Sequence, residues 1–222
     1  MGEREENNRK IRDLTPSNVF ITEQSMRCDL QTYHLRGYDL SKAEKVLKEI
    51  ESMTARRFLP IVGPDKGRVL VRVIREVKPK RVLEVGTLIG YSAILMAKEL
   101  ESDAHLITIE IHANEAEMAR ENIKRAEVAP TIDVLVGDAI KVIPKLTGKF
   151  DMVFVDAEKT EYLEYLRLVE RKLHRGSVVV ADNAGIFADQ MKDYLDHVRS
   201  SGKYSSEYVS FGEDGVEVSV KL

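Results

Sequence analysis

The chain has 222 residues, of which 43% are hydrophobic and 32% charged, a composition that suits one α/β domain with a sizeable core and a charged surface. A formal net charge of −3 gives no overall attraction to nucleic acid or to an anionic membrane, and the lone Cys28 excludes a disulfide framework within the chain. No apolar run approaches the roughly 20 residues that span a bilayer, and no signal-peptide core is evident. We therefore expect a cytoplasmic protein without a membrane-spanning segment.

The first 60 residues are predicted to form a tail and helices that precede the core. Residues 1–13 are polar and mixed in charge, as in a frayed terminus, and residues 19–35 are predicted to form one irregular helix. A further helix opens near Ser41, ends before Pro60 and carries these apolar residues on one face: Ala43, Val46, Leu47 and Ile50. We expect residues 1–60 to cover a functional site; the formation of a homodimer through them is the alternative.

Residues 61–222 are predicted to form the core of what is a single compact domain overall. Asp65 is predicted to cap a helix that ends at Lys78-Pro79. Strands are expected at residues 81–85, 106–110, 132–136, 150–155, 177–181, 204–211 and 216–222, with helices from residue 91 and at 113–126, 139–146, 160–173 and 187–200. Strands that alternate with helices require right-handed crossovers, hence a mostly parallel sheet with helices on both faces. The last two strands have no helix between them, so they form a hairpin and the last strand runs antiparallel.

A strand, a glycine turn and a helix start follow one another between residues 80 and 95. Gly86 and Gly90 interrupt the apolar run, and helical spacing begins at Tyr91. Glycines let a backbone approach a ligand closely, and the first N–H groups of a helix bind anions. The Gly-x-Gly-x-x-Gly spacing of dinucleotide sites is absent, which disfavours a nicotinamide oxidoreductase. A nucleotide-binding turn and a merely structural turn therefore remain alternatives.

Polar side chains are predicted at the carboxyl ends of the strands, where ligands bind in open α/β sheets. They are Glu84, Glu110, Asp138, Asp156, Asp182 and Asn183. Five acids at one edge would be costly to bury unpaired, which favours a binding site. Glu110 ends the second strand, where an acid commonly accepts hydrogen bonds from ribose hydroxyls; an exposed strand-end charge is the alternative.

Asp156, Asp182 and Asn183 offer only oxygen ligands, the kind that Mg²⁺ and Ca²⁺ prefer. The alternative is helix capping, by Asp156 near residue 160 and by Asp182 or Asn183 near residue 187. Lys159 follows Asp156 by three residues, so a loop can aim it at the same site, where a desolvated lysine can act as a general base. An ordinary surface lysine is the alternative.

Four motifs follow one another between residue 61 and the C-terminus. They are Val62-Gly63-Pro64-Asp65-Lys66-Gly67, the strand–turn–helix segment at residues 82–93, Val155-Asp156-Ala157-Glu158-Lys159, and Val180-Ala181-Asp182-Asn183. In this order they make residues 61–222 resemble the S-adenosylmethionine- and metal-dependent O-methyltransferases related to catechol O-methyltransferase, in which the second motif binds the cofactor. The resemblance implies a Rossmann-like class I methyltransferase fold, an α/β structure with a mostly parallel seven-stranded sheet, an antiparallel last strand and helices on both faces.

The resemblance also implies the cofactors and the residues that bind them. Asp156, Asp182 and Asn183 would hold Mg²⁺, or another divalent cation such as Ca²⁺ or Mn²⁺, and Lys159 would be the base. The residues implied to bind S-adenosylmethionine are Val62, Glu84, Gly86, Tyr91, Ser92, Glu110, Ile111, Asp138, Ala139 and Asp156. Glu213 would match a family acid that binds the second substrate hydroxyl.

Within that set the resemblance assigns a part of the cofactor to most residues. Ser92 and the Val62 backbone would hold the methionine carboxylate, and Gly86 would lie near the amine. Glu110 would bind the ribose, and residues 138–139 would line the adenine. Glu84 would support the glycine turn.

The implied reaction is methyl transfer to one hydroxyl of a vicinal diol or catechol-like small molecule. Animal members of the family clamp a catechol ring with aromatic residues, whereas this chain has no Trp and carries Glu158 at one clamp position. A hydroxylated uridine of tRNA is the alternative acceptor, which the slightly acidic charge disfavours. A non-catalytic cofactor-binding protein is a third alternative, disfavoured by the complete metal set and Lys159.

Overall fold

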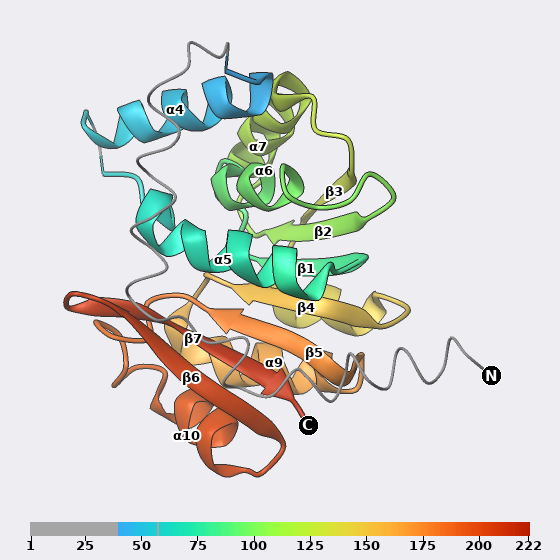
Figure 1. Ribbon diagram of the computed structural model, residues 1–222, viewed down its shortest axis with the longest axis vertical. Coiled ribbons are helices and arrows are strands. Elements are labelled where there is room, and N and C mark those ends of the chain that lie inside the picture. The colour runs from blue at the N-terminus through green and yellow to red at the C-terminus, as the bar shows by residue number, and fades with distance from the viewer. Residues whose placement is uncertain (1–39, 57) are drawn as a thin grey trace.

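The computed structural model describes residues 40–56 and 58–222, and within them the chain folds as one sheet flanked by helices (Figure 1). The predicted tail at residues 1–13 and the predicted helix at 19–35 lie outside the described residues. No helix in the described part of the chain has the length and apolar character needed to cross a membrane.

Seven strands make up the sheet, in the spatial order β3-β2-β1-β4-β5-β7-β6. They are β1 (Arg81–Val85), β2 (His105–Glu110), β3 (Thr131–Val136), β4 (Phe150–Val155), β5 (Leu173–Ala181), β6 (Tyr204–Phe211) and β7 (Asp214–Lys221). Neighbours among β1 to β5 pair in parallel, and β7 lies antiparallel between β5 and β6. The predicted sheet, with its hairpin and antiparallel last strand, is confirmed.

The helices divide between the two faces of the sheet. One face carries α4 (Lys42–Thr54), α5 (Gly63–Val77), α6 (Tyr91–Ala97) and α7 (Ala113–Ala126); the other carries α8 (Ala139–Val142), the 3₁₀ turns η1 (Ile143–Lys145) and η2 (Lys159–Glu161), α9 (Tyr162–Glu170) and α10 (Lys192–Ser200). In Figure 1, α5 crosses in front of the sheet and α9 lies behind it. Successive residues of a strand point to opposite faces, so Val82 packs under the first set of helices and Leu83 under the second.

The register aligns the carboxyl ends of the central strands. Val85 at the end of β1 pairs with Ile109 of β2 and with Val155 of β4, and Val155 pairs with Ala181 of β5. The residues that follow these positions therefore meet at one edge of the sheet. This alignment is what brings the predicted site residues together.

Some predicted boundaries are wrong. α5 begins at Gly63 rather than at an Asp65 cap, because Pro64 is preorganised for the first helical turn, where its missing N–H is not needed. β5 begins at Leu173, which pairs with Phe150 ahead of an irregularity, so the preceding helix ends earlier than predicted. α10 begins at Lys192 rather than near residue 187, because a series of turns occupies the chain between β5 and that helix.

Candidate active site

Gly86 is required by the close approach of the ends of β1 and β4. Its φ is 97°, in the left-handed region, and an added Cβ would lie 2.1 Å from the carbonyl oxygen of Asp156. The Asp156 N–H in turn donates to the carbonyl of Val85 at 2.9 Å. The glycine turn thus keeps the first strand against the predicted metal motif.

Glu110 holds the same turn from the other side. It is only 5% exposed, so the alternative of an exposed strand-end charge is wrong. Its carboxylate accepts hydrogen bonds from the backbone N–H of Leu88 at 2.7 Å and of His112 at 2.9 Å. Ile111, next to it, is 61% exposed, an apolar side chain left open at the sheet edge. Glu110, His112 and Glu115 also lie near enough to one another to share a cation.

Glu84 is a buried carboxyl with one oxygen unsatisfied. Thr108 Oγ1 donates to Oε2 at 2.6 Å, while Oε1 has no hydrogen-bond partner among the described residues. Burial raises the pKa of Glu84 to about 8, against the opposing effect of the Ser92 hydroxyl. A buried acceptor without a donor destabilises the fold, so a proton on this oxygen or a hydrogen bond from a ligand would be stabilising.

The other predicted cofactor residues lie around this edge. Val62 is the N-cap residue that immediately precedes α5, and Asp138 caps α8 by accepting from the N–H of Ile140 at 2.9 Å. Lys141 beside Asp138 lowers the pKa of that carboxyl. Tyr91 is buried, and its hydroxyl donates to Glu51 of α4 at 2.6 Å. Ser92 and Ala139 are also buried, on α6 and α8.

The three predicted metal ligands lie at the ends of the adjacent strands β4 and β5. Asp182 is 2% exposed, and burial together with the nearby Asp156 raises its pKa to about 6. Asn183 has a φ of 61°, which turns the chain sharply after β5. Capping by these residues is wrong: Glu158 caps η2, and α10 follows Met191 without a side-chain cap.

Two charged residues that sequence reasoning missed complete this group. Lys66 of α5 places its Nζ 2.8 Å from the carboxylate oxygens of Asp182 and 2.8 Å from Oδ2 of Asp214. Asp214 begins β7, and its Oδ2 also accepts from the Asn183 amide at 2.8 Å. Asp214 therefore joins this group, whereas the neighbouring Glu213 is exposed, and its implied part in binding the second substrate hydroxyl stays a prediction. Lys66 belongs to the motif at residues 62–67, but only the folded structure shows that its side chain faces Asp182.

Lys159 is a partly buried residue of the same group, and the alternative of an ordinary surface lysine is wrong. Its side chain is 14% exposed, and Nζ lies 3.0 Å from Asp156 Oδ1 and 2.8 Å from the hydroxyl of Tyr162. That hydroxyl lies 3.4 Å from the carbonyl oxygen of Asp182. The ring of Phe187 lies beside the amine, 6.0 Å from Nζ to the centroid. One ammonium thus faces a carboxylate, a phenol and an aromatic ring.

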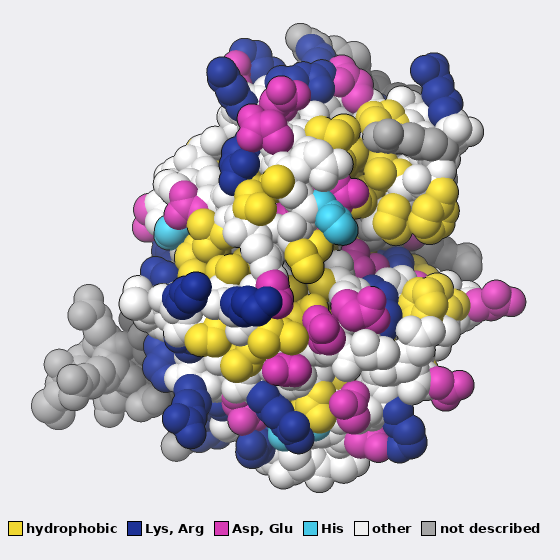
Figure 2. Space-filling view, turned by 180° about the vertical axis from the view of Figure 1, so that it is seen from behind, with side chains coloured by type: hydrophobic (Ala, Val, Ile, Leu, Met, Phe, Trp, Pro, Cys, Tyr) yellow, Lys and Arg dark blue, Asp and Glu magenta, His cyan; other side chains and the backbone are white. Residues whose placement is uncertain are grey.

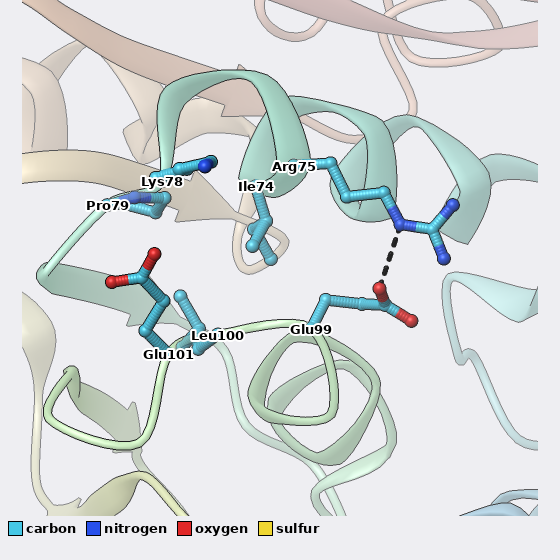
Figure 3. A pocket seen from close by; sticks show the side chains of 7 residues that line it. All are labelled: Ile74, Arg75, Lys78, Pro79, Glu99, Leu100 and Glu101. Carbon is cyan, nitrogen blue, oxygen red and sulfur yellow. Dashed lines mark hydrogen bonds and ion pairs between the residues drawn. The ribbon is translucent and has the colours of Figure 1, made fainter.

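A separate hollow lies at the opposite edge of the sheet (Figure 3). The residues that line it are Ile74, Arg75, Lys78, Pro79, Glu99, Leu100 and Glu101. They come from the chain just before β1 and just before β2, where these strands begin. An ion pair of 2.9 Å joins Arg75 to Glu99 across it. None of the predicted site residues lines this hollow.

Comparison with known proteins identifies the family. The family model described as O-methyltransferase matches residues 39–200. The chain belongs to this O-methyltransferase family. It is 39% identical over 126 residues to catechol O-methyltransferase of Niastella koreensis, an alignment that covers 55% of this chain and 57% of that protein. The chain thus spans little more than half the length of that relative.

Two further matches cover a larger share of the protein to which this chain is aligned. Catechol O-methyltransferase of Sus scrofa is 35% identical, over 72% of this chain and 91% of that protein. Among solved structures, the O-methyltransferase TomG from Streptomyces achromogenes, in complex with SAM, matches with a TM-score of 0.73 and 26% identity, over 91% of this chain and 100% of that one. These matches confirm the predicted Rossmann-like methyltransferase fold.

Proposed function

We propose that the protein is an S-adenosylmethionine-dependent O-methyltransferase that methylates one hydroxyl of a vicinal diol or catechol-like small molecule, with a divalent cation and Lys159 as the base. The observation that carries the proposal is the meeting, at one sheet edge, of an oxygen-donor set with a partly buried lysine and the glycine turn. The catechol acceptors named for two of the relatives favour a small molecule over tRNA.

The residues fit a divalent cation, with Mg²⁺ the first choice and Mn²⁺ or Ca²⁺ as alternatives. Asp156, Asp182 and Asn183 would hold it through oxygen atoms. Burial and the nearby Asp156 raise the pKa of Asp182, so a cation beside this carboxylate would stabilise its charged form; the ammonium group of Lys66 already lies 2.8 Å from it. When bound, such a cation supplies a Lewis acid that lowers the pKa of a substrate hydroxyl.

Lys159 would move the proton. Its Nζ, once neutral, accepts the hydroxyl proton while the hydroxyl oxygen attacks the sulfonium methyl carbon in line. The oxygen–carbon bond forms as the carbon–sulfur bond breaks, so the products are the methyl ether, S-adenosylhomocysteine and a protonated Lys159. The contact of 2.8 Å with Tyr162 and that of 3.0 Å with Asp156 hold the amine in place, which is the positioning such a transfer requires.

The predicted cofactor residues suit S-adenosylmethionine. Glu84 has a buried oxygen to which no described residue donates, and the methionine ammonium is a donor of the kind that it lacks. Glu110 keeps free lone pairs for ribose hydroxyls beyond its two backbone contacts, and the exposed Ile111 offers an apolar surface to an adenine ring. The other cofactor contacts stay as implied by the resemblance.

The substrate ring would rest on apolar side chains near Lys159. Phe187 lies beside Nζ, and Ile186 is 53% exposed. Glu158, which stands at a clamp position of the family, instead caps η2 with its carboxylate. We therefore propose a more open ring site than one enclosed by tryptophans. Figure 2 shows acidic and basic side chains interspersed on the face it views, with no broad basic field among the described residues there, which supports a small acceptor over RNA.

Calorimetric binding of S-adenosylmethionine, followed by methyl transfer to a panel of catechols and a tRNA sample, tests the proposal. Each reaction is run with Mg²⁺ and with a chelator. We expect cofactor binding and Mg²⁺-dependent methylation of a vicinal diol. Equal turnover in the chelator would overturn the role of the cation. Methylation of the tRNA alone would overturn the small-molecule acceptor, and failure to bind the cofactor would overturn the proposed activity.

A further inference from the structure

Lys66 is placed as a cation between two carboxylates. It lies in the first turn of α5, its side chain is 15% exposed, and Nζ lies 2.8 Å from Asp182 and 2.8 Å from Asp214. Asp182 is 2% exposed and Asp214 17% exposed. A carboxylate as buried as Asp182 is strongly destabilised without a counter-charge, so the ammonium group stabilises the metal-free fold.

Asp214 is held independently of Asp182. It accepts hydrogen bonds from the Asn183 amide nitrogen at 2.8 Å and from the backbone N–H groups of Gly185 and Ile186 at 3.3 Å each. Because Asp214 takes the nitrogen of the Asn183 amide, the amide oxygen points away from Asp214 and remains available as a ligand. Asp214 therefore keeps its place, and orients Asn183, whatever Asp182 binds.

We propose that Lys66 is an internal cation that competes with a divalent metal for Asp182, and that Asp214 retains the lysine when Asp182 turns to the metal. Asp214 is thus a positioning residue, which acts through Lys66 and Asn183. The inference rests on the proposed metal site. It follows from charge: an ammonium and a divalent cation that share one carboxylate repel each other, and a second carboxylate at the same distance gives the ammonium another partner.

Lys66 and Asp214 should then have opposite effects on the affinity for the metal. In Lys66→Met the competitor is absent, so Mn²⁺ should bind about tenfold more tightly, the scale expected for removing one nearby unit charge. In Asp214→Asn the lysine has Asp182 as its remaining carboxylate and Asn183 loses its charged partner, so Mn²⁺ should bind about tenfold more weakly. Lys42→Met, which removes an exposed ion pair with Glu127, is the control and should leave affinity unchanged.

The test is a titration of the full chain with Mn²⁺, with free Mn²⁺ read by electron paramagnetic resonance. Unfolding is measured in parallel in chelator and in saturating Mn²⁺. Lys66→Met should be less stable than the parent protein in chelator, and the difference should shrink in Mn²⁺, because the metal replaces the lost counter-charge. A purely structural ion pair would give the same loss in both conditions.

The outcomes separate this inference from the metal site itself. If the parent protein binds Mn²⁺ but Lys66→Met binds it equally or more weakly, competition by Lys66 is overturned. If Lys66→Met does not fold, Asp214→Asn decides, and unchanged or tighter binding by that variant overturns the inference. If the parent protein does not bind Mn²⁺, the proposed metal site fails and this inference fails with it.

Discussion

Replacement of Gly86 by alanine tests the glycine turn most directly. The residue has a φ of 97°, and the new Cβ would lie 2.1 Å from the Asp156 carbonyl oxygen and 2.8 Å from its carbonyl carbon. The left-handed backbone costs an alanine about 1–2 kcal/mol, and the forced shift of packed backbone costs about 1–3 kcal/mol more. We expect Gly86→Ala to lower the free energy of unfolding by about 3 kcal/mol, or the midpoint temperature by about 6–12 °C for a chain of this size.

Gly202→Ala is the matched control. Gly202 also has a positive φ, of 72°, but apart from its chain neighbours no described residue has an atom within 4 Å of the position that its Cβ would take. Gly202→Ala should therefore lower the free energy of unfolding only by the cost of the left-handed backbone, about 1–2 kcal/mol. Urea unfolding followed by circular dichroism measures both variants, and equal losses would refute the argument that β1 and β4 meet too closely for a side chain. Gly86→Ala should also weaken Mn²⁺ binding, because it displaces Asp156, whereas Gly202→Ala should not.

Three further predictions concern single side chains. Burial raises the pKa of Glu84 from 4.5 to about 8 in the folded protein. Between these two pH values the folded state keeps a proton that the unfolded state has released, so the free energy of unfolding falls as the pH rises from about 4.5 to about 8. Glu84→Gln should remove this slope, and urea unfolding of the cofactor-free protein at pH 5 and pH 8 measures it; a stability difference from the parent protein that does not change with pH would contradict the assignment. Lys159→Ala should lower turnover by about 10²-fold or more while the dissociation constant of S-adenosylmethionine stays nearly constant; a large loss of cofactor binding in calorimetry would count against the base role. Asp182→Ala should abolish Mg²⁺-dependent turnover and weaken Mn²⁺ binding. If the turnover of this variant still falls in chelator as that of the parent protein does, Asp182 is excluded as a ligand.

The convergence of the site was predictable from the sequence because it depends on topology rather than on side-chain detail. Once strands and helices alternate, the strands are parallel and their carboxyl ends share an edge. Glu110 ends β2, Asp156 and Asp182 directly follow β4 and β5, and the register aligns those strand ends. Sequence reasoning could not choose between ligand and cap, because both use a carboxylate at the same position. In the structure Glu158 caps η2 and α10 follows Met191 without a side-chain cap, so the capping alternative is wrong, while the role of these residues as metal ligands stays a proposal.

Long-range charge pairs were not predictable. Lys66 is separated from Asp182 by 116 residues and from Asp214 by 148, and no local periodicity encodes such contacts. Glu213 lies in the tight turn between β6 and β7 and Asp214 begins β7, and only the hydrogen bonds of Asp214 with Lys66 and Asn183 show that this acid faces the site. The predicted boundary between the helix and the strand near residue 173 is wrong for a related reason. The pairing of Leu173 with Phe150 extends β5 into a stretch that local patterning predicts as helix.

The arrangement of charges also indicates which lysine can be the base. Three carboxylates, of Asp156, Asp182 and Asp214, face two ammonium groups, so each predicted carboxylate ligand has a lysine beside it. The two lysines differ in their second partner. Lys66 has Asp214, a second carboxylate that holds its charge. Beyond Asp156, the partners of Lys159 among the described residues are the hydroxyl and ring of Tyr162 and the ring of Phe187, none of them a carboxylate. A general base must give up its proton to act, and a lysine held by two carboxylates is the poorer choice because both favour its charged form. Of the two, Lys159 is therefore the better candidate for the proposed base, and Lys66 for the proposed counter-charge.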